Sequence, residues 1–349
     1  MRKLASIQKI SDICPIEGAD RIELVKVLGW QCVAKKGEFQ KGDLCVYFEV
    51  DSLLPIRPEF EFLRPNSYTT NEVIGEGFRL RTQKFRGQIS QGLCLPMSFV
   101  DEAIRSELSE GTDVTELLGV RKFEMPEMAT SDGTIIGSLP SNVPHTDETR
   151  IQSKPELLQE FSGKPYYITT KIDGSSHSVS MDADGFHVMS HNCEYKDDGK
   201  YKFYEMVKGM GLPEKLQEYL HNNPETTSIV IQGEYAGPGI QKNRLKLKEP
   251  HWYVFDIRIN QKRVPLTILK FLCKSLELEM VPVEEEGADL PSLYPTIESL
   301  LKRAEGQYPA GGPKEGIVVR TCVPVYSPII DTDLSMKIIN NKYLLKNKD

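Results

Sequence analysis

The residues best suited to chemistry stand together near the middle of the chain, in residues 166–174. This short apolar run leads to Lys171, Asp173 and Gly174. A lysine amine becomes a nucleophile when burial or neighbouring cations remove its proton, and it can then attack phosphorus. Asp173 has the same strand parity as Lys171, so it is expected to face the same cleft, where a carboxylate can hold a divalent metal. Gly174 allows a sharp turn with the backbone close to a phosphate.

Further candidate residues stand at strand ends in the second half of the chain. Glu234 ends an apolar strand and is followed by two glycines, where the backbone can approach a ligand. Glu315 precedes a β-branched run, Phe255 lies in an aromatic strand, and Lys337 lies on the last expected strand. Taken singly, each also fits a structural role, as a strand-end surface charge or, for Phe255, a core aromatic.

Their order along the chain is more specific than any one of them. The series Lys171-x-Asp-Gly, Gly-Glu234, Phe255, Glu315-Gly and Lys337 resembles the signature motifs of the covalent nucleotidyltransferase superfamily of ligases and capping enzymes. Residues 146–152, 232–243 and 335–346 look more closely like the ATP-dependent RNA ligases that carry an amino-terminal OB domain ahead of the catalytic domain. This resemblance covers nearly the whole chain.

The resemblance implies a reaction in three steps. Lys171 attacks the α-phosphorus of ATP, expels pyrophosphate and becomes a lysyl-adenylate. The AMP passes to an RNA 5′-phosphate, and a 3′-hydroxyl then displaces AMP and joins the strands. The implied partners are ATP, a divalent metal (Mg²⁺ or Mn²⁺) and RNA, either a nicked duplex or broken strands. Nicked duplexes with an RNA 3′-hydroxyl strand are the favoured substrate, which suggests RNA repair.

The resemblance also assigns roles to individual residues. The hydrated metal would be held by Asp173, Glu234 and Glu315. Lys337 would contact the α-phosphate and depress the pKa of Lys171 by like-charge repulsion, and Phe255 would stack on adenine. The implied nucleotide-binding set is Lys171, Arg150, His191, Glu234, Phe255, Glu315 and Lys337.

Two positions depart from the family pattern. Where the family usually has an arginine in a Ser-Arg-Asn context, this chain has His191, which offers one hydrogen bond when neutral rather than a bidentate pair. Lys337 lacks the second lysine of the frequent Lys-x-Lys motif, and Lys342 is a candidate to compensate.

Composition and pattern predict an α+β protein of two domains. With 349 residues, 39% of them hydrophobic, the chain can bury a large core. We expect an OB-fold nucleic-acid-binding domain, an OB-type β-barrel, over residues 1–100 and a linker with peripheral elements over 101–164. Residues 165–349 are expected to form the catalytic adenylyltransferase domain, antiparallel-rich and of the ATP-grasp-like ligase type. A monomer is expected.

The short strands of the first hundred residues carry a basic patch that could track phosphates. It consists of Arg79, Arg81, Lys84 and Arg86. A solvated strand face is the commoner explanation of such a cluster. Three aromatics, Trp30, Tyr47 and Phe48, are candidate base-stacking platforms, although a core role is favoured for each.

Charge and cysteine usage exclude several classes. The formal charge of -7 argues against coating a polyanion over a whole face, but basic clusters remain at 242–248 and 342–348. Seven scattered cysteines without a C-x-x-C pair, no apolar signal region and no bilayer-length apolar run predict an intracellular protein. Phosphate-binding P-loop and His-Glu-x-x-His metal motifs are absent from the sequence.

Two other functions remain open. An mRNA capping guanylyltransferase shares the lysine chemistry, but in that family, as in DNA ligases, the OB domain follows the catalytic domain. Only twelve residues follow Lys337 here. A nucleic-acid-binding OB protein with a degenerate nucleotidyltransferase domain is the other alternative, and the joint presence of Lys171, Asp173, Glu234 and Glu315 argues against it.

Overall fold

The computed structural model describes residues 2–124 and 134–346, and the chain forms two compact units. The first unit comprises residues 1–126, 152–155 and 344–349, and the second comprises 127–151 and 156–343. The predicted linker of 101–164 is therefore divided between the units. Its residues 125–133, and Lys348 of the carboxyl-terminal basic cluster, lie outside the described residues.

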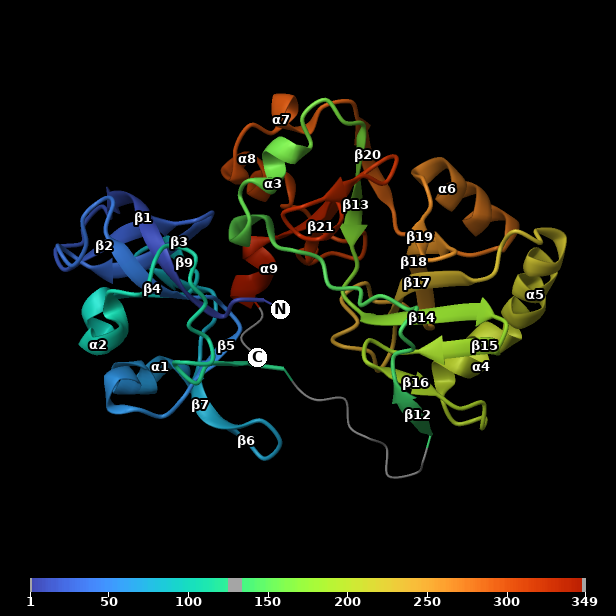
Figure 1. Cartoon of the computed structure of the whole chain (residues 1–349), viewed down its shortest axis with the longest axis horizontal. Helices are drawn as coiled ribbons and strands as arrows, with labels where there is room; N and C mark the ends of the chain where they lie inside the picture. The colour runs from blue at the N-terminus through green and yellow to red at the C-terminus, as the bar shows by residue number, and fades with distance from the viewer. Residues whose placement is uncertain (1, 125–133, 347–349) are drawn as a thin grey trace. The chain divides into compact units, whose positions relative to one another are not determined.

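The first unit is built on a five-stranded antiparallel sheet in the order β10-β4-β1-β2-β3 (Figure 1). Its strands are β1 (Ala5–Pro15), β2 (Ile22–Val27), β3 (Trp30–Lys35), β4 (Leu44–Phe48) and β10 (Leu93–Pro96). A second sheet has the order β11-β5-β7-β6, from β5 (Ser52–Leu54), β6 (Tyr68–Asn71), β7 (Gly75–Arg79) and β11 (Arg121–Lys122). A hairpin of β8 (Gln83–Phe85) and β9 (Gln88–Ser90) and the short helices η1 (Pro58–Leu63), α1 (Arg64–Ser67), η2 (Met97–Phe99) and α2 (Glu102–Arg105) complete it.

The aromatic residues of these strands form the core of the first unit. Trp30 is 2% exposed, and Tyr47 and Phe48 are fully buried. Phe48 packs edge-on against Phe60 with ring centroids 5.6 Å apart. The core role favoured for the three aromatics is therefore confirmed, and none of them offers a ring face to a nucleic-acid base.

Two antiparallel sheets organise the second unit. The larger has the order β12-β16-β15-β14-β17-β18-β19 and the smaller β20-β13-β21-β24. The larger comprises β12 (Ile135–Ser138), β14 (Ser175–Asp182), β15 (Gly185–Met189), β16 (Cys193–Tyr195), β17 (Ile229–Ala236), β18 (His251–Ile259) and β19 (Lys262–Arg263). The smaller comprises β13 (Tyr166–Lys171), β20 (Val283–Gly287), β21 (Gly316–Thr321) and β24 (Ser335–Ile339), beside a hairpin of β22 (Tyr326–Ser327) and β23 (Thr332–Asp333).

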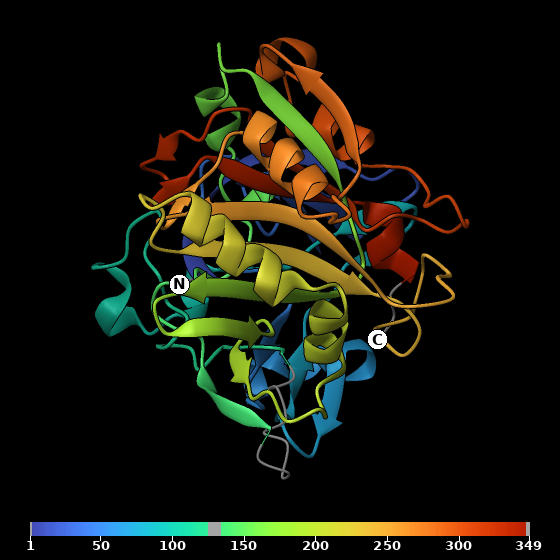
Figure 2. The same ribbon diagram turned by 90° about the vertical axis from the view of Figure 1, so that its right-hand side faces the viewer.

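Helices pack against both sheets of the second unit. Apolar residues of α4 (Lys202–Gly209), α5 (Leu212–Asn222) and α6 (Leu266–Ser275) share one core with the larger sheet, and Figure 2 shows α5 and α6 lying across its face. The smaller sheet packs against α3 (Leu157–Glu160), α7 (Leu290–Leu293) and α8 (Ile297–Arg303). The remaining helices are η3 (Ile151–Ser153) and α9 (Asn341–Lys346).

The expected fold class, α+β with an antiparallel-rich second half, is confirmed. The apolar and alternating runs of the second half predict strands at 166–170, 176–181, 186–190, 228–234, 252–259 and 316–320. These correspond to β13, β14, β15, β17, β18 and β21 within one or two residues. Helices α4 and α5 were not predicted. The amphipathic pattern of residues 101–108 predicts a helix there, and the structure has a single turn, α2, in this range.

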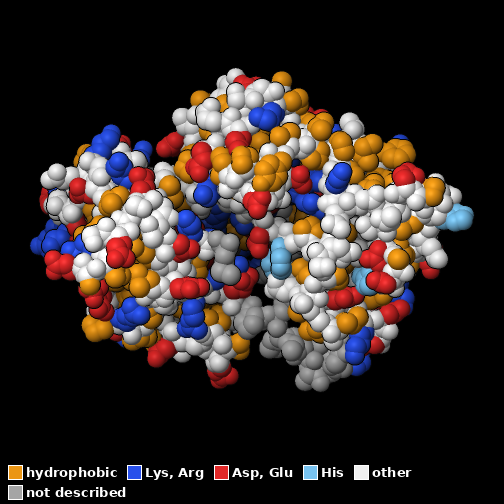
Figure 3. Space-filling model, in the orientation of Figure 1, with side chains coloured by type: hydrophobic (Ala, Val, Ile, Leu, Met, Phe, Trp, Pro, Cys, Tyr) orange, Lys and Arg blue, Asp and Glu red, His pale blue; other side chains and the backbone are white. Residues whose placement is uncertain are grey.

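Acidic and basic side chains are interspersed over the visible face in Figure 3. Within residues 2–124 and 134–346, none of the helices combines the length and the apolar character that crossing a membrane requires.

Candidate active site

Lys171 is the last residue of strand β13, where the two sheets of the second unit meet. β13 pairs with β21 so that Lys171 lies opposite Gly316. This pairing brings the Lys171 Nζ atom to 2.9 Å from the Glu315 Oε1 atom. A side chain at position 316 would place its Cβ atom 2.1 Å from the carbonyl oxygen of Ile338. The glycine is therefore required for β24 to pass close behind the ion pair.

Glu234 approaches the same lysine from the larger sheet. It lies on β17 opposite Ser176 of β14, and its Oε1 atom accepts a hydrogen bond of 3.1 Å from the backbone N–H of Gly174. A Cβ atom at position 174 would lie 2.5 Å from the carbonyl oxygen of Tyr235. In this structure Gly174 thus allows close packing on β17, in addition to the turn that the sequence predicts.

Asp173 is held by two residues that the sequence argument did not place in the site. Arg244 Nε lies 2.8 Å from Asp173 Oδ2, and the Tyr343 hydroxyl donates to Asp173 Oδ1 at 2.9 Å. The Arg244 guanidinium also lies over the Tyr343 ring, 4.9 Å from its centroid. Both residues belong to the basic clusters noted in the sequence, but their separation from Asp173 along the chain hid the contact.

Tyr308 is a further residue of the site that sequence reasoning missed. Its hydroxyl donates to the carbonyl oxygen of Lys171 at 2.7 Å and accepts from the backbone N–H of Glu315 at 3.1 Å. The side chain is 3% exposed. One hydroxyl therefore fixes the backbone of both partners in the ion pair. No sequence motif marks this residue.

Arg150 and Lys337 lie close together, and Lys337 brings its positive charge near Lys171. The backbone N–H of Lys337 donates to the carbonyl of Thr149 at 2.8 Å, and Arg150 forms a parallel bridge with Lys337. Burial, followed by the nearby charges of Lys171 and Arg150, lowers the pKa of Lys337 to about 8. The two predicted nucleotide-binding cations are therefore brought together.

The acidic groups decide the charge state of Lys171. Burial lowers its pKa, but Glu315 and then Glu234 outweigh this effect and raise the pKa to about 12. Any lowering of the Lys171 pKa by Lys337 is therefore outweighed in this structure by Glu315, Glu234 and Asp173. Burial, opposed by Lys171, raises the pKa of Glu234 to about 7, and Glu315 and Asp173 contribute to the rise.

Phe255 is one of the residues that line a polar pocket. It is the extra residue of a β-bulge, because Gln232 pairs with Asp256 while Gly233 pairs with Val254. The bulge aims its ring at a pocket lined by residues 144–149, Gln232 and Arg320. The guanidinium of Arg320 lies 5.6 Å from the ring centroid of Phe255.

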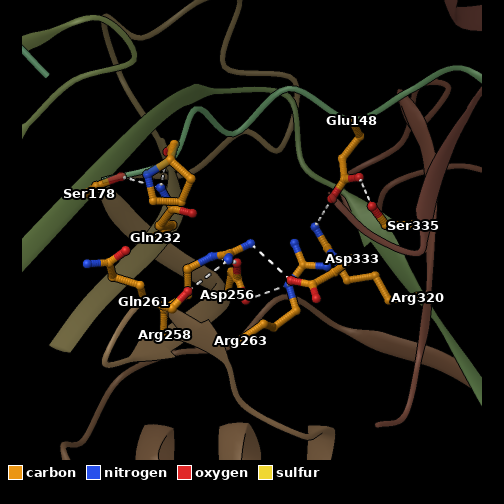
Figure 4. Close-up of polar contacts among 11 residues, drawn as sticks. Glu148, Ser178, Gln232, Asp256, Arg258, Gln261, Arg263, Arg320, Asp333 and Ser335 are labelled. Atoms are coloured by element: carbon orange, nitrogen blue, oxygen red, sulfur yellow. Dashed lines mark hydrogen bonds and ion pairs between the residues drawn. The ribbon is translucent and has the colours of Figure 1, made fainter. Parts of the chain in front are cut away.

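Buried ion pairs hold the walls of this pocket (Figure 4). Arg320 Nη2 lies 2.6 Å from Glu148 Oε1, and the Ser335 hydroxyl donates to the other Glu148 oxygen. Burial raises the pKa of Glu148, but Arg320 and Arg263 outweigh it, so the net pKa is lowered. A second set joins Arg258 and Arg263 to Asp256 and Asp333.

His191 and Lys342 are the two positions at which the chain departs from the family pattern. His191 Nε2 lies 3.5 Å from Asp147 Oδ2, and its Nδ1 atom lies 3.3 Å from the Thr146 hydroxyl. It is thus tied to the segment that lines the pocket. Lys342 instead forms an exposed ion pair of 2.6 Å with Glu305.

The carboxylates around Lys171 suit a hydrated divalent cation. Across the described residues, no three His, Cys, Asp or Glu side chains are close enough to coordinate one metal directly. Burial and the charge of Glu315 nevertheless raise the pKa of Asp173, and burial, with Glu315 and Asp173 contributing, raises the pKa of Glu234 to about 7. Oxygen donors that repel one another fit a hard cation retaining its own waters.

Comparison with known proteins agrees with this geometry. A family model described as an RNA ligase matches residues 164–339, and one described as an OB-fold domain matches residues 4–97. The structure of a Naegleria gruberi RNA ligase with pyrophosphate is 34% identical, with a TM-score of 0.86 and 100% of both chains covered. A glutamate-to-alanine variant of that ligase with ATP and manganese is 33% identical, with a TM-score of 0.87 and the same 100% coverage of both chains. The comparison with curated protein sequences gives no match.

An OB-fold unit combined with an antiparallel unit centred on a lysine defines a ligase of the covalent nucleotidyltransferase type. More narrowly, the chain belongs to the RNA ligase family. The resemblance drawn from the motifs, the OB fold and the enzyme class are thereby confirmed.

Proposed function

We propose that the protein is an ATP-dependent RNA ligase that joins 3′-hydroxyl and 5′-phosphate ends, with Lys171 as the nucleophile. The observation that carries the proposal is the surroundings of the Lys171 amine. Glu315 lies 2.9 Å from it, Glu234 and Asp173 add negative charge, and Lys337 and Arg150 add positive charge. An amine between carboxylates and cations suits in-line attack on phosphorus, which needs orientation and charge neutralisation more than acid–base chemistry.

The first step requires Lys171 to lose a proton. With a pKa of about 12 the amine is protonated at neutral pH, so adenylylation begins by weakening the hold of the carboxylates. Asp173, Glu234 and Glu315 would hold a divalent cation through its waters, and its positive charge would offset theirs and favour the neutral amine. The neutral amine then attacks the α-phosphorus, the Nζ–P bond forms as the bond to pyrophosphate breaks, and Lys337 and Arg150 lie where the phosphate oxygens gain charge.

Phe255 and the adjoining pocket are proposed to hold the adenine of ATP. The ring borders a pocket whose walls include the carbonyl-rich segment 144–149 and Gln232. The Gln232 amide donates to the Pro144 carbonyl at 2.8 Å, which fixes this segment against β17. His191 acts through its contacts to Asp147 and Thr146 as a positioning residue for the same segment.

The remaining steps use the RNA. The AMP passes from Lys171 to an RNA 5′-phosphate, and a 3′-hydroxyl displaces AMP to form the phosphodiester. We propose that a nicked duplex with an RNA 3′-hydroxyl strand is the substrate, that the OB-fold unit binds the duplex, and that the enzyme acts as a monomer in RNA repair. An intracellular place of action follows from these substrates.

A ligation assay tests this proposal. A nicked RNA duplex carrying a 5′-³²P label at the nick is incubated with the protein, ATP and MgCl₂ or MnCl₂, and the products are resolved on a denaturing gel. The sealed strand and an AMP-capped intermediate are expected. A duplex with a DNA 3′-hydroxyl strand is the matched control and should seal more slowly. If the labelled strand stays at its starting length and uncapped under every condition, the proposed function is contradicted.

A further inference from the structure

The loop between β17 and β18 carries a regular alternation of basic residues. Cations stand at every second position, Lys242, Arg244, Lys246 and Lys248. Leu245 and Leu247, which alternate with these cations, pack against the apolar cluster that contains Ile172 and Tyr253. The loop is thus anchored beside the nucleophile strand, and three of its four cations, Lys242, Lys246 and Lys248, are exposed.

Polar contacts give this loop a defined shape. The Asn243 amide donates to the carbonyl of Leu247 and accepts from its backbone N–H, both at 3.0 Å. These reciprocal hydrogen bonds close the segment on itself and set the direction in which its cations project. The exposed lysines therefore form a small basic surface on a fixed support.

Arg244 differs from its three neighbours because it turns inward. Its side chain is 18% exposed and forms the 2.8 Å ion pair with Asp173, whose side chain is 10% exposed. The contact with the Tyr343 ring holds the guanidinium from a second side. A largely buried ion pair therefore joins the basic loop to a carboxylate only two residues from Lys171.

This pair is in tension with the proposed function, on which the inference rests. If Asp173 holds a hydrated cation, its carboxylate faces that cation and the Arg244 guanidinium together, and the two positive charges repel. An anion on Arg244 relieves the repulsion. Phosphate, like carboxylate, matches the planar guanidinium fork. The exposed lysines continue the positive surface outward, which suits a polyanion strand rather than a single compact nucleotide.

We infer that Arg244 exchanges Asp173 for the 5′-phosphate of the RNA, and that the loop of residues 237–250 docks the strand that carries this phosphate. In the free enzyme the Arg244 guanidinium is paired with the Asp173 carboxylate. When Asp173 turns to its cation, the guanidinium becomes available to the RNA end that must receive AMP. Binding of the cation and binding of the correct RNA end are thus coupled through one side chain.

Equilibrium binding without catalysis tests the inference. The protein is first treated with pyrophosphate to remove bound AMP. Two fluorescent nicked RNA duplexes, identical except for a 5′-phosphate or a 5′-hydroxyl at the nick, are then titrated with it by anisotropy, without ATP and with or without MnCl₂. The wild type should bind the 5′-phosphate duplex more tightly once MnCl₂ is added, by about tenfold or more for a charged hydrogen bond.

Three variants separate the possible results. Arg244→Ala should bind both duplexes equally under all conditions. Asp173→Asn should show the phosphate preference without MnCl₂, because its arginine is already released. Lys248→Ala, the matched control, should weaken both duplexes alike and keep the preference. Retention of the full preference by Arg244→Ala, or a preference in Asp173→Asn that still needs MnCl₂, would overturn the inference.

Failure of the proposed function can be recognised separately. A wild-type protein that takes no label from α-labelled ATP contradicts the ligase chemistry whatever the binding curves show. A protein that takes the label, but whose Arg244→Ala variant still prefers the 5′-phosphate, contradicts only the role of Arg244.

Discussion

Lys337 is a cation that the folded protein holds at a cost. Its pKa is lowered to about 8 from an ordinary 10.5, by burial first and then by Lys171 and Arg150. When a lysine has a lower pKa in the folded than in the unfolded protein, the free energy of unfolding decreases as the pH falls from the unfolded pKa to the folded pKa. The charge therefore lowers the free energy of unfolding at every pH below about 8, which is consistent with a residue kept for binding an anion.

We expect Lys337→Met to raise the free energy of unfolding at pH 7 by up to about 3 kcal/mol and to slow formation of the lysyl-adenylate. The stability difference should disappear near pH 10.5, where the wild-type amine is neutral. Urea denaturation at the two pH values measures it. Lys342→Met, whose side chain is 65% exposed, is the control and should change stability by less than about 0.5 kcal/mol. A Lys337→Met protein less stable than wild type at pH 7 would be the contrary result.

Tyr308 has the opposite effect, since it stabilises the site that it positions. Tyr308→Phe removes the hydrogen bonds of the Lys171 carbonyl and the Glu315 N–H, and we expect a cost of about 1–3 kcal/mol for leaving such buried groups unpaired. Misplacement of the nucleophile should also slow lysyl-adenylate formation by about tenfold to a hundredfold. Tyr326→Phe, which loses only an exposed bond to Asp331, should match wild type in both assays. Equal stability and rate in Tyr308→Phe would show that the bridge has no role.

At the scale of elements, the network around Glu148 joins three parts of the second unit. Glu148 lies in the segment that leads to Arg150, Arg320 lies on β21, and Ser335 lies on β24. Arg320 and Ser335 are directly opposite each other in the β21–β24 pair. The network therefore sets the position of the segment that carries Arg150 relative to the strand that carries Lys337.

A double-mutant cycle measures this connection. Arg320→Met leaves the Glu148 carboxylate buried without its guanidinium, and we expect it to lower stability by about 3–5 kcal/mol. Glu148→Gln should be similarly harmful, whereas the double variant should cost less than the sum of the two by about 0.5–3 kcal/mol. Urea unfolding of the four proteins provides the numbers. Strict additivity would mean that the two residues do not act as a pair.

The elements near the lysine were predictable because the sequence pattern there is local. The β-strands of the second unit alternate or run apolar between glycines, and the signature residues stand at their ends, so both could be placed from sequence. Helices α4 and α5 were missed, although Pro213 at the start of α5 and the spacing of Leu212, Leu216 and Leu220 carried a helical signal.

Other features could not be found from the sequence. The contacts of Tyr308, Arg244 and Tyr343 join positions 70 to 170 residues apart, which no local pattern encodes. The net direction of the Lys171 pKa shift could not be predicted from the sequence for a related reason. The sum of three carboxylates against two cations depends on distances that only the packed sheets determine.

At the scale of the whole molecule, a chain with a formal charge of -7 must bind RNA through local basic surfaces. In the OB-fold unit the predicted basic patch is divided. Arg79 is half-buried over the Phe123 ring, 4.0 Å from its centroid, whereas Lys84 and Arg86 are exposed at the end of the β8–β9 hairpin. Phe85 between them is 37% exposed, which makes it a better stacking candidate than the three buried aromatics.

We expect this hairpin to contribute to RNA binding. The plot of log affinity for nicked RNA against log salt concentration has a negative slope. The double variant Lys84→Ala/Arg86→Asn should reduce the magnitude of that slope by about 1 to 2. Asparagine is chosen because residue 86 has a φ of 44°, which it tolerates. Phe85→Ala should cost about 1–3 kcal/mol of binding with little change in the salt slope. Lys35→Ala/Lys36→Ala, exposed in the same unit, is the control. An unchanged salt slope in the hairpin variant would exclude the surface.

The most direct test of the central claim is covalent labelling of the protein. Wild type and Lys171→Ala are incubated with α-³²P-ATP, and separately with α-³²P-GTP, in the presence of a divalent metal, and are then resolved on a denaturing gel. We predict label on wild type from ATP, little or none from GTP, and none on Lys171→Ala. Label from GTP alone would indicate a capping-type guanylyltransferase, and a folded protein that takes no label from either nucleotide would contradict the assignment of Lys171 as the nucleophile.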